Sequence, residues 1–127
     1  MNAKTPKRFV AVGHCGPDAA MLGSALRRAL PGATLTAVND DAALDAHRDG
    51  DAVWLVNRLL DGDFADEDGI ALLAREAARG HGATLLLISN LDEAQESARA
   101  AGARRGFGKL ALHRPETTEL LRSLGGA

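Results

Sequence analysis

Short apolar runs alternate along this chain with longer stretches in which apolar residues recur every three or four positions. The short runs are typical of strands buried on both faces, and the longer stretches are typical of amphipathic helices. The pattern predicts strands at residues 9–12, 34–38, 52–56, 84–88 and 106–112. It predicts helices at residues 16–30, 41–47, 70–78, 91–101 and 115–124. The last strand is the weakest of the five, because it contains two glycines.

Five strand–helix units in succession predict a parallel sheet, because parallel neighbours need crossover connections. We therefore expect an α/β fold, a three-layer αβα sandwich with helices on both faces of a five-stranded sheet. Right-handed crossovers favour the strand order 2-1-3-4-5. We expect one domain over residues 1–127, with a flexible N-terminus at 1–7 and an extended acidic loop at 61–68.

Composition excludes several function classes. The formal net charge of −2 gives no global field that would attract nucleic acid or an anionic membrane. A single cysteine excludes a disulfide framework and a cysteine-rich metal site, and no apolar run reaches membrane-spanning length. We expect a cytoplasmic protein without a metal or cofactor, and the abundance of Ala, Arg and Gly suggests a GC-rich bacterial genome.

The segments that follow the strands should meet at one rim of the sheet, where ligands bind in folds of this kind. They are Gly13-His14-Cys15, Asn39-Asp40, Asn57-Arg58, Ser89-Asn90 and Lys109.

Three segments resemble the receiver domains of bacterial response regulators, which have a flavodoxin-like (CheY-like) fold and act in two-component signalling. A strand, 85–88, ends at Ser89, and the helix after it ends at Ala101-Gly102-Ala103, six residues before Lys109. The stretch Asp68–Leu73 resembles the Asp-Gly-x-x-Leu-Leu pattern of the family. The resemblance implies that Ser89 occupies the position of the switch hydroxyl and Lys109 that of the receiver lysine.

The sequence departs from the receiver family at the residues that carry out phosphorylation in that family. The resemblance places Val56 at the phosphoacceptor position, and a shift of one residue would place Asn57 there. Gly13 and His14 stand where receivers carry the acidic pair that holds Mg²⁺. Aspartyl phosphate formation needs both the metal and a carboxylate nucleophile. The sequence therefore predicts a degenerate receiver, a pseudo-receiver that is not phosphorylated and holds no metal.

Three functions remain open. The first is a signalling module that works through contacts with a separate protein partner or as a homodimer, through its first helix or through the face of the fourth helix, fifth strand and fifth helix. The second is a sensor of a small anion or nucleotide at the rim. The third is an enzyme or redox sensor that uses Cys15 beside a helix N-terminus. The tentative ligand-binding residues of the sensor form a neutral to basic set: His14, Asn57, Arg58, Ser89 and Lys109.

Structural roles compete with each of these functions. Ser89 suits the N-terminal cap of the helix after it, Lys109 suits a purely structural hydrogen bond, and Cys15 suits ordinary packing. The acidic loop lacks the glycine and glutamate spacing of an EF-hand, so we interpret it as solvated. The remaining histidines are expected at exposed positions: His47, His81 and His113.

Overall fold

The computed structural model describes residues 7–125. The strands are β1 (Arg8–Val12), β2 (Thr34–Val38), β3 (Ala52–Asn57), β4 (Thr84–Ile88) and β5 (Arg104–Phe107). The helices are α1 (Gly16–Ala29), α2 (Asp41–Leu44), α3 (Gly69–Arg79), α4 (Asp92–Ala101) and α5 (Pro115–Leu124), with short 3₁₀ turns η1 (Asp45–His47) and η2 (Lys109–Ala111). Residues 1–6, most of the N-terminus expected to be flexible, lie outside the described part.

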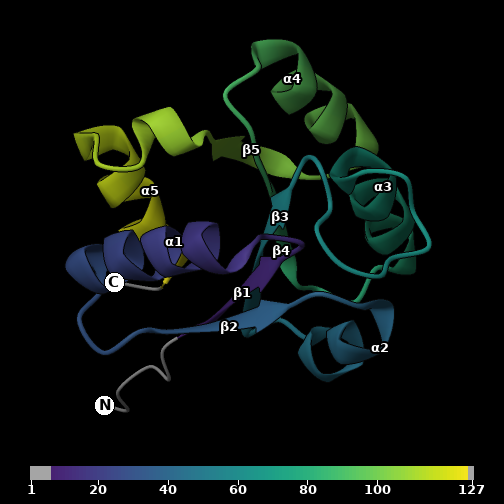
Figure 1. Ribbon diagram of the computed structural model, residues 1–127, viewed down its shortest axis with the longest axis horizontal. Coiled ribbons are helices and arrows are strands. Elements are labelled where there is room, and N and C mark those ends of the chain that lie inside the picture. The colour runs from purple at the N-terminus through teal and green to yellow at the C-terminus, as the bar shows by residue number, and fades with distance from the viewer. Residues whose placement is uncertain (1–6, 126–127) are drawn as a thin grey trace.

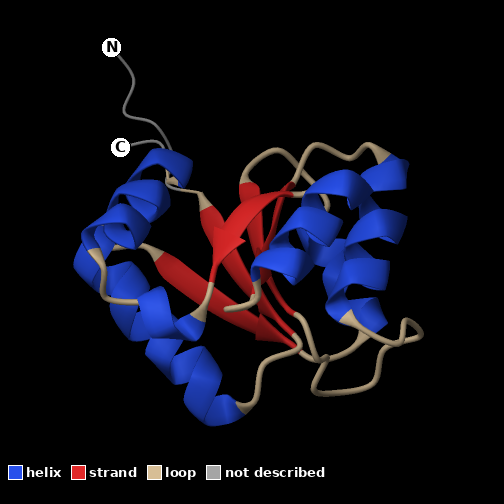
Figure 2. Cartoon of the chain, turned by 90° about the horizontal axis from the view of Figure 1, so that it is seen from above, coloured by secondary structure: helices blue, strands red, loops and turns tan. Residues whose placement is uncertain are grey.

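The five strands form one parallel sheet in the order β2-β1-β3-β4-β5, which confirms the predicted topology. Helices α1 and α5 cover one face of the sheet, and α2, α3 and α4 cover the other (Figures 1 and 2). The α/β sandwich is therefore confirmed as well. Within the described residues, no helix is both long and apolar enough to cross a membrane.

Alternate side chains of the central strands supply two separate cores, as expected of strands that are buried on both faces. On β3, Val53 and Leu55 pack toward α1 and α5, whereas Trp54 and Val56 pack toward α2, α3 and α4. The four side chains are almost or completely inaccessible to solvent. The apolar pattern of the sequence thus fixes which residues are buried, although it does not say against which helix.

The prediction for the last strand is wrong in its position. β5 ends at Phe107, and the residues after Gly108 form the η2 turn instead of continuing the strand. Gly106 lies so close to β4 that an added Cβ would stand 2.0 Å from the carbonyl oxygen of Leu87. A Cβ on Gly108 would likewise lie 1.8 Å from Oδ1 of Asn90. The two glycines allow close backbone approach there, and the strand is shorter than the apolar pattern indicates.

A buried carboxylate links α3 to η1, and the sequence analysis did not find it. Glu76 is completely buried, and Arg48 donates to it from Nε to Oε1 (2.8 Å) and from Nη2 to Oε2 (3.2 Å). His81 Nε2 lies 3.1 Å from Glu76 Oε1, and its ring stacks on Trp54 with centroids 5.5 Å apart. Burial alone would raise the pKa of Glu76, but the hydrogen bonds and charge of Arg48, the hydrogen bond with His81 and the charge of Arg79 together lower that pKa.

The expected exposure of the three histidines is correct for one of them. His113 is exposed, whereas His81 is mostly covered by its stacking on Trp54. His47 is half-buried, and its carbonyl oxygen accepts a hydrogen bond of 2.9 Å from Trp54 Nε1. Trp54 therefore contacts both histidines, by stacking on His81 and by its hydrogen bond to His47. Local sequence patterns do not indicate these contacts, because they join separate segments.

Candidate functional site

A cavity of about 460 Å³ opens at the carboxyl ends of the strands, and we call it the rim cavity. Four residues that the sequence analysis selected line it: Asn57, Arg58, Ser89 and Lys109. The other lining residues are Asp18, Leu59, Ile88, Asn90 and Leu91. The parallel topology brings these segments together, because the carboxyl ends of neighbouring strands meet at the same edge.

The fifth selected residue, His14, does not line the cavity but is buried, with 2% of its surface exposed. Its Nε2 lies 2.9 Å from the carbonyl oxygen of Leu55. Because a carbonyl only accepts, Nε2 carries the proton, and Nδ1 has no partner among the described residues. Burial lowers the pKa of His14, although the bond to Leu55 opposes the effect. His14 is therefore a neutral core residue, and the structure does not bring it together with the four selected residues that line the cavity.

Lys109 is paired with a carboxylate that the sequence analysis did not assign to the rim. Its Nζ donates a hydrogen bond of 2.5 Å to Oδ2 of Asp18, in the first turn of α1. The Lys109 ammonium lowers the pKa of Asp18, and a hydrogen bond from the Cys15 thiol contributes to the same lowering. The set expected to be neutral to basic therefore includes an acid. The signal was present in the sequence, because a helix that follows a strand begins at the edge where that strand ends.

The structure does not assemble a catalytic pair from His14 and Cys15. Cys15 is the N-terminal cap residue of α1, is partly exposed and is not part of a disulfide. The Nε2–H of His14 is directed to Leu55, and its Nδ1 makes no hydrogen bond to the thiol. The polar group beside Cys15 is instead the carboxylate of Asp18. That carboxylate is already paired with the ammonium of Lys109, and His14 makes no hydrogen bond that would activate the thiol.

Val56, at the position where the resemblance predicts a phosphoacceptor, is completely buried. In register it lies beside Val12 on one side and Leu87 on the other, and Val38 continues the same apolar row. The next residue, Asn57, is half-buried, and its Nδ2 donates a hydrogen bond of 3.0 Å to the carbonyl oxygen of Gly13. The Asn57 side chain, the first polar group after the apolar row, thus links the end of β3 to the end of β1.

The loop after β3 covers the end of β1. The amide of Asp61 donates a hydrogen bond of 2.8 Å to the carbonyl oxygen of Gly13, which has a left-handed φ of 73°. A Cβ on Gly13 would lie 2.7 Å from Cδ2 of Leu60. Asn39 fixes the loop from the other side, since its Nδ2 donates to the carbonyl oxygens of His14 (3.0 Å) and Asp61 (2.8 Å). An acidic side chain at position 13 would therefore require Leu60 to move.

Ser89 shapes the turn before α4 rather than capping the helix directly. Its Oγ accepts a hydrogen bond of 3.2 Å from the amide of Leu91, which is itself the N-terminal cap residue of α4. Its carbonyl oxygen accepts one of 3.1 Å from Nε2 of Gln95. Gln95 is buried and also binds Leu87 on β4 and Gly106 on β5, so one amide side chain joins α4 to two neighbouring strands.

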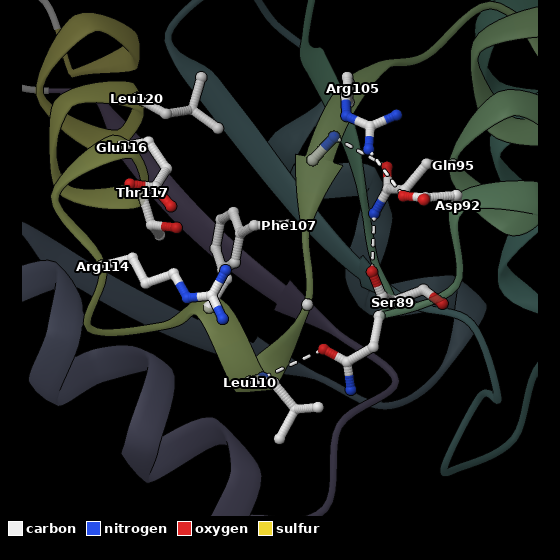
Figure 3. A pocket seen from close by; sticks show the side chains of 14 residues that line it. Ser89, Asp92, Gln95, Arg105, Phe107, Leu110, Arg114, Glu116, Thr117 and Leu120 are labelled. Carbon is white, nitrogen blue, oxygen red and sulfur yellow. Dashed lines mark hydrogen bonds and ion pairs between the residues drawn. The ribbon is translucent and has the colours of Figure 1, made fainter.

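A second cavity, of about 590 Å³, lies between α4, β5 and α5, and we call it the α4–β5–α5 groove. Figure 3 shows Phe107 at its centre, Asp92 and Arg105 on the side of α4, and Glu116 and Leu120 on the side of α5. Asn90 lines both cavities and accepts a hydrogen bond of 3.1 Å on Oδ1 from the amide of Leu110. The groove lies on the face of the fourth helix, fifth strand and fifth helix that was expected as a possible contact surface, and its walls come from these three elements.

The residues 7–125 contain no group of three or more potential metal-ligating His, Cys, Asp or Glu side chains. Oxygen-rich ligation of Mg²⁺ requires carboxylates from several elements in one place. At the rim, Asp18 is engaged with Lys109, and the ends of β1 and β3 present Gly13 and Asn57. The donor set therefore does not fit a divalent cation.

No protein-family model matches the sequence, and no curated protein matches it either. Several solved structures match the fold. The signal receiver domain of a DNA-binding response regulator from Colwellia psychrerythraea 34H is 15% identical, with a TM-score of 0.72 over 95% of this chain and 99% of that one. The receiver domain of the Francisella response regulator 1452 is 18% identical, with a TM-score of 0.69 over 96% and 98%.

A response regulator from Burkholderia pseudomallei, solved with a phosphorylated aspartic acid, a calcium ion and citrate, is 19% identical. Its TM-score is 0.61, and the match covers 92% of this chain and 72% of that one. The structures that match are receiver domains and response regulators of bacteria. This chain therefore has the fold of a receiver domain.

Proposed function

We propose that this chain is a signalling module of the receiver type that works without phosphorylation, through protein contacts on the α4–β5–α5 groove. The observation that carries the proposal is the burial of Val56, an apolar side chain with no exposed surface at the position that the resemblance assigns to the phosphoacceptor. A single domain that cannot form an aspartyl phosphate has to signal through what it binds.

Two features oppose phosphoryl transfer. No carboxylate nucleophile stands at the ends of β1 and β3, because Gly13 follows β1 and β3 ends with the buried Val56 and Asn57. The metal has no carboxylate to bind, because Asp18 is held by Lys109 at 2.5 Å. The Burkholderia response regulator with its phosphorylated aspartic acid and calcium ion has the same fold and illustrates the chemistry that these residues lack.

The α4–β5–α5 groove has the character of a protein contact surface. Leu110 at its edge is 80% exposed, the largest exposure among the large apolar side chains of the described residues. The groove carries both signs of charge: Arg105, paired with Asp92 at 3.0 Å, and the exposed Arg114 near Glu116. A two-fold axis would bring the basic groups of one copy to the acidic groups of the other. We therefore propose a second copy of this chain as the partner.

Treatment of the purified chain with acetyl phosphate and Mg²⁺, followed by intact mass spectrometry, tests the first part of the proposal. We expect an unchanged mass, and a receiver that retains its phosphoacceptor aspartate, treated in parallel, shows that the reagent is active. The addition of one phosphoryl group to this chain would contradict the proposal.

Sedimentation equilibrium over micromolar to millimolar protein concentrations tests the second part. We expect concentration-dependent dimers that Leu110→Asp dissociates, because a charge would enter an apolar contact. Met21→Asp is the matched control, since Met21 on α1 is also an exposed apolar side chain (46%) but lies outside the groove. A chain that stays monomeric, or dimers that only Met21→Asp disrupts, would rule out this surface as the site of self-association.

A further inference from the structure

The rim cavity combines charges of both signs with an apolar edge. Lys109 and Arg58 supply positive charge, and Asp18 supplies one negative charge. The side chains of Lys109 and Asp18 are 31% and 29% exposed, so solvent and a small ligand can reach their ion pair. The amide side chains of Asn57 and Asn90 add neutral hydrogen-bonding groups to the wall.

These charges do not suit a simple anion. An anion beside Lys109 would also lie beside the carboxylate of Asp18, which already accepts the hydrogen bond from Nζ at 2.5 Å. A ligand with adjacent positive and negative groups avoids this repulsion. Its cation can contact Asp18 while its anion contacts Lys109 and Arg58, so that charges alternate around the group and neither side of the protein ion pair loses its partner.

The edge of the cavity is apolar, and this restricts the ligand further. Leu59, in the loop after β3, is 62% exposed, and Leu91, in the turn before α4, is 53% exposed. Ile88 at the end of β4 adds a buried apolar contact. Covering exposed leucine surface is favourable in proportion to the apolar area removed from water. The volume of about 460 Å³ lies within the usual range of small-molecule sites.

We propose that the rim cavity binds a free α-amino acid with an apolar side chain. The ammonium group contacts Asp18, the carboxylate contacts Lys109 and Arg58, and the side chain covers Leu59 and Leu91. This site goes beyond the proposed signalling function and does not depend on it, because it lies on the other side of Asn90 from the α4–β5–α5 groove.

Isothermal titration of the full chain with L-leucine tests the ligand class, with three analogues that each lack one group. They are 4-methylpentanoate without the ammonium, 3-methylbutylamine without the carboxylate, and glycine without the side chain. We expect leucine to bind and each analogue to bind at least about tenfold more weakly, the size of effect expected when a charged hydrogen bond or a buried side chain is lost. Equal binding of 4-methylpentanoate or of inorganic phosphate would overturn the proposal in favour of an anion site, and no binding of leucine would overturn it altogether.

The variant Asp18→Asn gives the sharper test, because it should shift the preference of the cavity from leucine toward 4-methylpentanoate. We expect leucine to bind about tenfold more weakly and 4-methylpentanoate to bind more tightly, since the carboxylate that repels an anion is gone. Asp92→Asn is the matched control: Asp92 is also a paired, exposed acid, but it lines the neighbouring groove. Leucine binding that Asp18→Asn leaves unchanged would contradict the site.

Amide chemical shifts of the unaltered chain locate the ligand without any substitution. On addition of leucine we expect the largest changes at Asp18, Arg58, Ser89 and Lys109. Changes centred on the α4–β5–α5 groove would place the amino acid elsewhere and refute the assignment. The same spectra distinguish the two proposals, because loss of leucine binding leaves the dimer measurement unaffected, and loss of the dimer leaves the leucine shifts in place.

Discussion

The substitution Val56→Asp places a carboxyl group at the position that the resemblance assigns to the phosphoacceptor and tests whether that position is open to water. Val56 has no exposed surface and lies in the apolar row between Val12 and Leu87. Removing the apolar side chain costs about 1.5–2 kcal/mol of unfolding free energy. Keeping an aspartate of ordinary pKa, near 3.9, protonated at about pH 7 costs about 4 kcal/mol more.

We therefore expect Val56→Asp to lose about 5–6 kcal/mol near pH 7, a large part of the whole stability of a small domain. Burial raises the pKa of the new carboxyl group above its unfolded value, so the protonation cost is absent at low pH and grows as the pH rises. Near pH 4.5 the loss should fall to about 2–3 kcal/mol.

Urea denaturation followed by circular dichroism at both pH values measures the effect, with Val56→Ala as the control that removes the side chain without adding a charge. Val56→Ala should lose about 2 kcal/mol at either pH. The reasoning is refuted if Val56→Asp is as stable as Val56→Ala near pH 7, or if it accepts a phosphoryl group from acetyl phosphate. Either result would mean that the position opens to solvent.

Three further predictions concern the core. Arg48→Met should lose about 2–4 kcal/mol in urea denaturation because it leaves the Glu76 carboxylate buried with fewer partners, and adding Glu76→Leu should restore part of the loss. His14 is neutral in the folded chain, so unfolding takes up a proton below about pH 6.5; stability should fall there by up to about 1.4 kcal/mol per pH unit, and His14→Gln should abolish that part of the slope. Gly106→Ala should lower the melting temperature, since its Cβ would meet the Leu87 carbonyl oxygen at 2.0 Å, whereas Ser97→Ala on the exposed face of α4 should not.

The period of the apolar pattern was enough to predict the sheet and its helices. The run at 52–56 had to be a strand buried on both faces, because every residue in it is apolar, and the structure places it at the centre of the sheet. Gly102 was expected to end α4, and it does so with the left-handed φ of 113° that favours glycine. The bounds of β5 were predicted wrongly because Gly106 and Gly108 lie against the backbone of β4 and against Asn90, which are distant in sequence.

The sequence predicted four of the residues that line the rim cavity, but it did not predict the carboxylate of Asp18 that lies among them. Asn57, Arg58, Ser89 and Lys109 were found because strand ends converge in a parallel sheet, a rule that follows from topology alone. The groups to which they bind, such as Asp18 for Lys109 and the carbonyl oxygen of Gly13 for Asn57, were not predicted.

Local sequence thus determined where most strands and helices lie and which residues stand at the positions that the resemblance assigns to receiver carboxylates, since both depend on the residue type at each position. Only the tertiary structure decided that Lys109 meets Asp18, that His14 is buried against Leu55 and that Leu60 covers Gly13. Each of these contacts joins segments separated by forty or more residues. Their geometry depends on how helices and loops pack on the sheet, which no local pattern specifies.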